Sequence, residues 1–279
     1  MSKTSSIIGL LIAIGGLALG ATMEGAPIMA VLNPAAMMIV LGGTLGVTIV
    51  GTSFDRIKAI PTLFMKVFNA EVLDLRARVG ELVGFAEKAR RDGLLALDDE
   101  LTTVHDEFMR RGLQLVVDGT DPDMVAEVLD SEVESMARRH AAGVQPFEKA
   151  GGFAPTMGII GTVFGLVHVL ENLDSPDTLG PAISAAFIAT LLGVATANVV
   201  FLPIANRLKQ LSAAEREFRM LTIEGILGIQ AGDNPRVLAD KLLTFVPPGE
   251  REAPVATTSA TAAAGAPAAG AGPDAALAA

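Results

Sequence analysis

Two threonines are the residues best placed to handle an ion, because each lies deep inside a long run that has no Asp, Glu, Lys or Arg. Thr162 belongs to the run 150–170, and Thr190 belongs to the run 178–206. A hydroxyl oxygen can coordinate a dehydrated cation or exchange hydrogen bonds with a protonated carboxyl group. A threonine in a membrane helix also often donates to the carbonyl four residues earlier. The residue type leaves both interpretations open for each threonine.

The two threonines are predicted to lie at the same depth in a membrane. If the first run crosses outward and the second inward, Thr162 lies eight residues before Leu170 and Thr190 lies eight residues after Ala182. At a rise of about 1.5 Å per residue, each hydroxyl then lies ~12 Å from the outer end of its run. We therefore predict that the two hydroxyls face one ion pathway together.

Small residues accompany both threonines at helical spacing. Glycines precede Thr162 on its helical face, and an alanine and a glycine flank Thr190 on its own. Faces of this kind let two helices approach closely, which is the alternative interpretation for the glycines. The predicted ion pathway consists of Thr162, Thr190, Gly158, Gly161, Ala186 and Gly193.

Neither run contains a carboxylate, so these two segments lack a proton carrier of their own. An ion is unstable without a partner in hydrocarbon, so we predict that another polypeptide supplies the titrating group. Other chemistry has little support, because there is no Cys, no HExxH or GxSxG motif, and the three His residues at 105, 140 and 168 are scattered. We predict no catalytic residue, no metal site and no cofactor apart from the transported ion.

The elements that would position these residues are predicted to be membrane helices. The chain has 279 residues and a mean hydropathy of +0.49, with 51% hydrophobic but only 4% aromatic residues, a balance that is rare in soluble domains. Two further uncharged runs, 4–23 and 25–54, bring the number of candidate spans to four. The first could instead be a cleaved signal peptide, which would leave an odd number of spans. The predicted fold is all-α, a polytopic membrane protein with four transmembrane helices and a helical cytoplasmic domain.

The distribution of Lys and Arg predicts the orientation. Of 21 such residues, one precedes the first run, thirteen lie within 55–149 and seven follow residue 206. The two short connections, 22–33 and 171–177, contain none. Because cationic segments are retained in the cytoplasm, both termini and the long middle segment are predicted to be cytoplasmic. A net charge of −10 argues against nucleic acid as a partner.

The cytoplasmic segments carry recognisable helix signals. Asp121 and Pro122 are typical of a helix start, and Asn234 with Pro235 predicts another. A stripe of apolar residues from Leu94 to Phe108 indicates a packed helical surface as well. The predicted parts are 1–54 with spans one and two, 55–149 as the cytoplasmic helical domain, 150–206 with spans three and four, 207–246 as C-terminal cytoplasmic helices, and 247–279 as a disordered tail rich in Ala, Pro and Gly.

Several motifs resemble those of MotA-type flagellar stator subunits. Asn33-Pro34 is followed by IVLGGTLG at 39–46, span three contains APTMGIIGTVFGL at 154–166, and span four contains ATLLG at 189–193. The motifs of spans three and four alone are similar to the wider MotA/TolQ/ExbB ion-channel superfamily. Four spans rather than three favour the flagellar branch, although a TolQ/ExbB-like energiser remains an alternative, as do a passive scaffold and a membrane enzyme.

The resemblance implies an assembly and a mechanism. The subunit would form a homo-oligomeric ring of five in the inner membrane of a bacterium, around two copies of a MotB-type single-span partner that binds peptidoglycan and supplies a membrane Asp. Ion flow would then drive torque on the flagellar rotor. The resemblance also implies that Pro155 and Pro203 take part in conformational coupling, whereas helix termination is the alternative from residue type alone.

A charge cluster in the cytoplasmic domain is similar to the rotor-contacting residues of the family. Arg90 lies three residues before Gly93 and Asp98 lies five residues after it, which is the family spacing for contacts with the switch-complex protein of the rotor. Without the resemblance, such a cluster reads as a solvated surface. The predicted rotor-interacting residues are Arg90, Arg91, Asp98, Asp99 and Glu100.

The identity of the ion depends on one position in span four. Sodium-driven relatives resemble this chain at Thr162 but have two adjacent threonines where this chain has Ala189 and Thr190. A proton needs no coordination shell, so we predict proton coupling, with sodium as the alternative.

Overall fold

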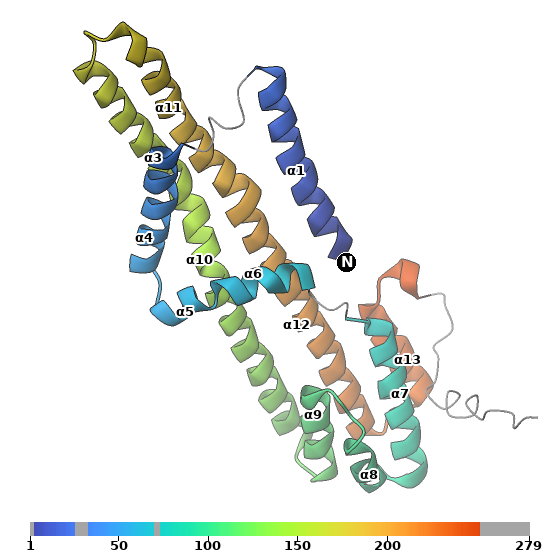
Figure 1. Cartoon of the computed structure of the whole chain (residues 1–279). Helices are drawn as coiled ribbons and strands as arrows, with labels where there is room; N and C mark the ends of the chain where they lie inside the picture. Colours follow the sequence, from blue (N-terminus) through green and yellow to red (C-terminus); the bar gives the residue numbers. More distant parts are fainter. Residues whose placement is uncertain (1–2, 26–32, 70–72, 252–279) are drawn as a thin grey trace, which may run out of the picture. The chain divides into compact units, whose positions relative to one another are not determined.

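The computed structural model describes residues 3–25, 33–69 and 73–251, and all regular elements in these ranges are helical (Figure 1). They form two compact units. The first contains residues 1–73 and 131–217, and the second contains residues 74–130 and 218–279. The helices α10 (Pro122–Glu171) and α12 (Leu202–Ala231) each contribute to both units.

The first unit holds the apolar helices. Besides its parts of α10 and α12, its elements are α1 (Lys3–Met23), α3 (Pro34–Met37), the π-helical η1 (Met38–Gly42), α4 (Gly43–Val50), α5 (Phe54–Lys58), α6 (Ile60–Asn69), α11 (Pro176–Ala195) and the π-helical η3 (Thr196–Phe201).

The second apolar helix begins at a cap that the sequence specifies. The side chain of Asn33 accepts hydrogen bonds from the amides of Ala35 at 3.0 Å and Ala36 at 3.1 Å, and Pro34 occupies the first helical position. These contacts satisfy amide groups that have no partner within the helix, which explains why the chain enters α3 at this residue.

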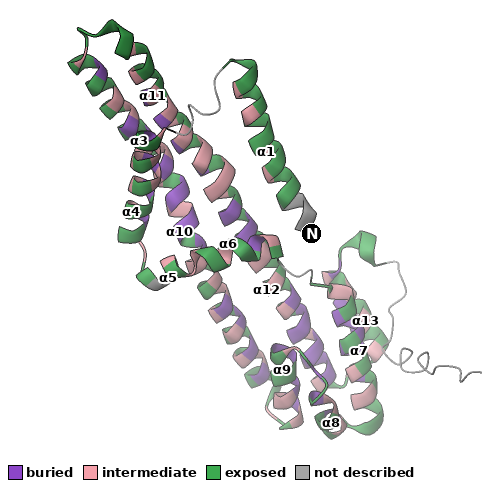
Figure 2. Ribbon diagram, in the orientation of Figure 1, coloured by how far each residue is buried: buried purple, intermediate pink, exposed green. Residues whose placement is uncertain are grey.

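Two of the four predicted spans are confirmed as long apolar helices. The helical stretches Pro122–Glu171 and Pro176–Ala231 are long and apolar enough to cross a bilayer, while Ile7–Met23 and Pro34–Val50 are shorter apolar helices. Only 22% of the most apolar window of each long stretch is buried within the protein, so most of it is free to face lipid or another chain (Figure 2).

The second unit is a helical bundle around an aliphatic core. Its elements, besides the remaining parts of α10 and α12, are α7 (Leu75–Asp92), η2 (Leu94–Leu97), α8 (Asp98–Leu101), α9 (Glu107–Val117), α13 (Pro235–Leu242), η4 (Leu243–Phe245) and η5 (Pro248–Glu250). Leu82, Leu113 and Leu221 are fully buried in it. A β-carbon at Gly112 or Gly225 would collide with the side chains of Ile226 and Leu82 respectively, so glycine permits this close helix packing.

Helix starts in this unit follow the predicted signals. Asp121 accepts from the amide of Asp123 at 3.0 Å at the start of α10, and Asn234 accepts from the amide of Arg236 at 3.1 Å at the start of α13. The tail begins with the short helical turn η5, and the predicted disorder beyond residue 251 lies outside the described part of the chain.

The predicted stripe of packed apolar residues from Leu94 to Phe108 is divided among several elements. The chain forms η2 and α8 and then leaves the helix, because the hydroxyls of Thr102 and Thr103 donate to the carbonyls of Asp99 and Glu100 at 3.0 and 2.8 Å. A new helix starts at Asp106, whose carboxylate accepts from the amides of the next turn. The residues Leu97, Leu101, Val104 and Phe108 are nevertheless all buried.

Candidate functional site

The hydroxyl groups of Thr162 in α10 and Thr190 in α11 are hydrogen-bonded to each other. The predicted equal depth of the two threonines is therefore realised by direct contact between two neighbouring helices. Both side chains are half-buried, which leaves part of the pair open toward the outside of the subunit.

Carbonyl oxygens surround the threonine pair. The Thr162 hydroxyl also lies 3.1 Å from the Gly158 carbonyl of its own helix and 3.1 Å from the Ala186 carbonyl of α11. The Thr190 hydroxyl lies 3.4 Å from the Gly158 carbonyl. The alternative interpretation of Thr162, a contact to the carbonyl four residues earlier, is confirmed, and its role toward an ion stays a prediction. Together the two hydroxyls and two carbonyls form a cluster of oxygen atoms with only two protons to donate.

The glycines near the pair hold α10 and α11 together. A β-carbon at Gly158 would lie 2.9 Å from the Ala189 carbonyl oxygen and 3.1 Å from the Cα of Thr190. A β-carbon at Gly161 would lie 2.8 Å from the Ala189 side chain, and Gly193 faces Gly158 from the other side. Close packing explains these glycines. Their part in an ion pathway, like that of the buried Ala186, stays a prediction.

The second apolar helix, Pro34–Val50, packs against α10 and α11 next to the threonine pair. Ala36 and Val40 are buried against Ala189, and Gly43 approaches Met157 of α10 so closely that a β-carbon would lie 2.9 Å from the sulfur atom. The contact fixes the level at which α4 meets α10.

Sequence reasoning missed two buried threonines on that helix. Thr44 and Thr48 are 0% and 2% exposed, and no hydrogen-bond partner of their hydroxyl oxygens is found among the described residues. Their spacing of four residues in an apolar helix was a visible signal of a shared face, but nothing in the sequence indicated burial.

The two prolines lie at different kinds of position. Pro155 is inside α10, which continues through it, next to the fully buried Ala154. Pro203 is in the first turn of α12, directly after η3, where the backbone has already departed from α-helical hydrogen bonding. The proposed conformational role of both residues stays a prediction.

Two lysines of the first unit make polar contacts near the end of the apolar run of α10. The Lys149 ammonium group donates to the Gly51 carbonyl, and Lys209 pairs with Glu148 at 2.5 Å. His168, near the other end of α10, lies 3.3 Å from the side chain of Asn172, which follows the helix. In the described ranges no group of three or more His, Asp or Glu could hold a metal ion.

The predicted rotor-interacting residues lie in the second unit around a tight turn. Gly93, with φ of 87°, caps α7 directly after Asp92 and lets the chain turn into η2 and α8. Arg90, Asp98 and Asp99 are exposed, and no ion pair of these three is found within the described residues. These three charges are free to meet a partner.

The other two members of that cluster are already paired. Arg91 contacts Asp92 at 2.8 Å, and this hydrogen bond raises the pKa of Arg91 and lowers the pKa of Asp92. Glu100 forms an ion pair with Lys88 of α7. Sequence reasoning did not anticipate these pairings, because the second one requires the turn at Gly93 to bring α8 back onto α7.

A buried ion pair stabilises the same unit. The side chain of Arg78 is 8% exposed, lies 2.6 Å from Asp106 and stacks on the Phe218 ring at 4.4 Å. Burial opposes ionisation of Asp106, but the Arg78 charge and hydrogen bonds from two amides outweigh it, so the pKa of Asp106 lies below its usual value. Its surroundings indicate a structural role.

Comparison with known sequences gives matches along most of the chain. A family model described as MotA/TolQ/ExbB proton channel family matches residues 100–220, and one described as Motility protein A N-terminal matches residues 7–90. Motility protein A of Bacillus subtilis (strain 168) is 40% identical over 252 residues, which is 90% of this chain and 93% of that protein.

Two solved structures have a similar arrangement of helices. The structure of MotAB from C. jejuni superposes with a TM-score of 0.85 at 30% identity, covering 89% of this chain and 98% of that one. The structure of the flagellar MotAB stator complex from Bacillus subtilis superposes with a TM-score of 0.81 at 39% identity, covering 88% of this chain and 98% of that one.

Proposed function

The chain belongs to the MotA/TolQ/ExbB proton channel family, and from this premise we propose that it is the ring-forming subunit of a proton-driven flagellar stator. It is a stator subunit of the flagellar motor that forms an ion channel with a MotB-type partner. The family consists of ion channels rather than enzymes.

The observation that carries the proposal is the threonine pair between α10 and α11. The two hydroxyls and two carbonyls offer hydrogen bonds to a carboxyl group, yet the spans 150–170 and 178–206 contain no carboxylate. An Asp of the MotB-type partner would complete the site, protonated on one side of the membrane and ionised toward the other. A ring of five such subunits would present this pair repeatedly to the partner.

Proton coupling is favoured over sodium coupling by the composition of the pair. A sodium ion must replace its hydration shell with oxygen ligands. Ala189, next to Thr190, supplies no hydroxyl and is buried against α3. The site around Thr162 and Thr190 therefore has one candidate ligand fewer than it would have with a threonine at position 189. A proton needs only a titrating group and water.

The proposed topology has four spans with both termini in the cytoplasm. The two long apolar helices, the two shorter ones and the exclusion of all Lys and Arg from the two short connections support it. The second unit then faces the cytoplasm, where Arg90, Asp98 and Asp99 are available to opposite charges on the rotor.

The ion can be tested directly by measuring torque. The chain would be expressed with its MotB-type partner in cells that lack their own stator, and rotation of tethered cells would be recorded with and without sodium. We expect the same torque in sodium-free buffer and loss of torque after collapse of the proton gradient. Complete loss of rotation in sodium-free buffer, with the proton gradient intact, would overturn proton coupling and favour sodium.

A further inference from the structure

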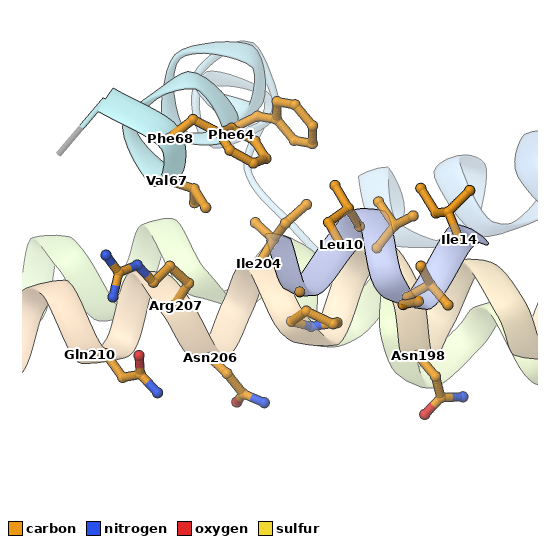
Figure 3. Close-up of a pocket in the computed structure, with 15 residues that line it drawn as sticks. Leu10, Ile14, Phe64, Val67, Phe68, Asn198, Ile204, Asn206, Arg207 and Gln210 are labelled. Atoms are coloured by element: carbon orange, nitrogen blue, oxygen red, sulfur yellow. The ribbon is translucent and has the colours of Figure 1, made fainter. Parts of the chain in front are cut away.

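An apolar groove of about 400 Å³ lies between α1, α6 and the helical stretch formed by η3 and α12. The residues that line it all belong to the first unit, and α1 contacts both α6 and η3. Leu10 and Ile14 of α1 form one wall, and Phe64 and Phe68 of α6 form another (Figure 3). Most of the lining is therefore aliphatic or aromatic.

The helix α1 packs loosely along this groove. Among its described side chains, residues 7–23, none is buried. Leu10 and Ala13 are half-buried and Ile14 is 50% exposed, although all three line the groove. Membrane helices associate through close van der Waals packing, and an apolar cavity offers water no hydrogen bonds. The groove therefore suits an apolar group that does not belong to these helices.

The two ends of the groove differ in charge. Figure 3 shows Arg207 and Gln210 at one end and Ile14 at the other. Arg207 is 8% exposed and is the first charged residue after the uncharged run 178–206, so it lies where the apolar span ends. No Asp or Glu occurs among the described residues that line the groove. A guanidinium group has five donors, so it can bind a phosphate group in addition to a partner within the protein.

The length of the groove matches one leaflet of a bilayer. Arg207 follows Asn198, at the deep end, by nine residues, so these two lining residues lie about 14 Å apart along the helix. A hydrocarbon core about 30 Å thick gives each leaflet about 15 Å. An acyl chain fits this length, whereas a spanning helix needs a surface about twice as long. A span of a second copy would also bring no carboxylate to Arg207, since the four apolar runs contain no Asp or Glu.

We propose that this groove binds one acyl chain of an anionic phospholipid from the cytoplasmic leaflet, with the phosphate group against Arg207. The choice of leaflet rests on the proposed topology, in which the end of the run 178–206 faces the cytoplasm. Basic pockets between membrane helices on this side of a membrane bind anionic lipid headgroups. The bound chain completes the packing of α1 against α6 and η3, and the proposed ion pathway does not require it.

Two glycines of α1 provide a matched pair of variants. Gly9 lines the groove, whereas Gly15 lies outside it on another face of the same helix. A β-carbon at either position meets no atom within 4 Å, so a leucine fits at both. Gly9→Leu places its side chain in the groove, and Gly15→Leu does not. Both changes raise the helix propensity by the same amount.

The test uses the full complex with its MotB-type partner, reconstituted into phosphatidylcholine vesicles. One sample contains a trace of phosphatidylglycerol with a photoreactive diazirine group in an acyl chain, and a second sample contains phosphatidylcholine with the same labelled chain. After illumination, mass spectrometry measures how much label each residue of α1 and α6 has received.

We expect phosphatidylglycerol to label the groove residues about fivefold more than phosphatidylcholine, because the choline cation cancels the phosphate charge that an arginine attracts. Gly9→Leu should reduce this labelling to the level on residues of α1 outside the groove, while Gly15→Leu should leave it unchanged. Arg207→Gln should reduce labelling by phosphatidylglycerol to the level of phosphatidylcholine.

Equal labelling of the Gly9→Leu and Gly15→Leu complexes would overturn the inference, and it would mean that a second copy or the partner closes the groove. Equal labelling by the two lipids would overturn it as well, because the groove would then not select an anionic headgroup. If Arg207→Gln fails to fold, the glycine pair and the two lipids still decide. Labelling depends neither on torque nor on the transported ion, so its failure would leave the proposed function intact.

Discussion

Replacing Gly158 by alanine should separate α10 from α11 at the threonine pair. The added β-carbon would lie 2.9 Å from the Ala189 carbonyl oxygen, 3.1 Å from the Thr190 Cα and 3.3 Å from the Gly193 Cα. All three atoms belong to the backbone, so no side chain can rotate away, and the two helices have to move apart. The hydrogen bond between the threonine hydroxyls spans this same contact.

The magnitude follows from two opposing terms. Alanine is the better helix former, which stabilises an exposed helical position by about 0.8–1.0 kcal/mol. Overpacking in a tight contact costs about 1–3 kcal/mol, and movement of the helices weakens hydrogen bonds worth about 1 kcal/mol each. The expected net loss at Gly158 is therefore about 1–3 kcal/mol. Gly152 of the same helix has no atom within 4 Å of its β-carbon position, so its alanine variant should be neutral or slightly stabilised.

The assay is thermal unfolding of the purified complex, followed by torque in cells. The Gly158→Ala complex should unfold at a lower temperature than the Gly152→Ala complex and generate less torque at equal expression. If the two variants had the same unfolding temperature and the same torque, α10 and α11 would not depend on the close contact at Gly158, and the geometry argued for the threonine pair would be wrong.

Three other variants probe separate parts of the chain. Thr190→Val keeps the shape of the side chain but removes its hydroxyl, so torque should fall by more than about tenfold. The control Thr190→Ser keeps the hydroxyl and should retain most of the torque. Equal torque in the two variants would contradict a role of the threonine pair. Because the pKa of Asp106 is lowered, its ion pair with Arg78 should stabilise the second unit at neutral pH. This stabilisation should be lost as the pH falls from about 3.9, the pKa of an unperturbed Asp, through the lower pKa in the folded protein. Unfolding followed by circular dichroism should show that Asp106→Asn removes this pH dependence. Arg90→Glu should lower torque without changing the unfolding temperature, because Arg90 is exposed. The control Arg91→Ala should lower torque less, since Arg91 is already paired with Asp92.

Features that depend on neighbouring residues were predictable from the sequence. Asn33, Asp121 and Asn234 each precede a proline and each begins a helix, because a capping side chain and a first-turn proline act within one turn of the backbone. The equal level of Thr162 and Thr190 along their two helices was likewise predictable, since a helix rises by a fixed amount per residue.

Features that depend on the path of the chain between elements were not predictable. The stripe from Leu94 to Phe108 has helical spacing because its residues share one core, yet two threonines and a new cap at Asp106 divide it. The pairing of Glu100 with Lys88 similarly needs the turn at Gly93, whose positive φ is a property of the folded chain. A periodic pattern of apolar residues indicates which side chains are buried, but buried side chains can belong to several short helices as well as to one continuous helix.

The contact between Thr162 and Thr190 also bears on how the site could work repeatedly. Both hydroxyls already have acceptors within the subunit, so an arriving carboxyl group must exchange one existing hydrogen bond for another. The net value of such a neutral bond is about 1 kcal/mol, so the exchange is nearly balanced and neither state becomes a trap. A lone threonine without these acceptors would hold the carboxyl group more firmly, because releasing it would leave a polar group unpaired in the membrane. The paired arrangement therefore favours rapid release, as a motor that repeats the same step requires.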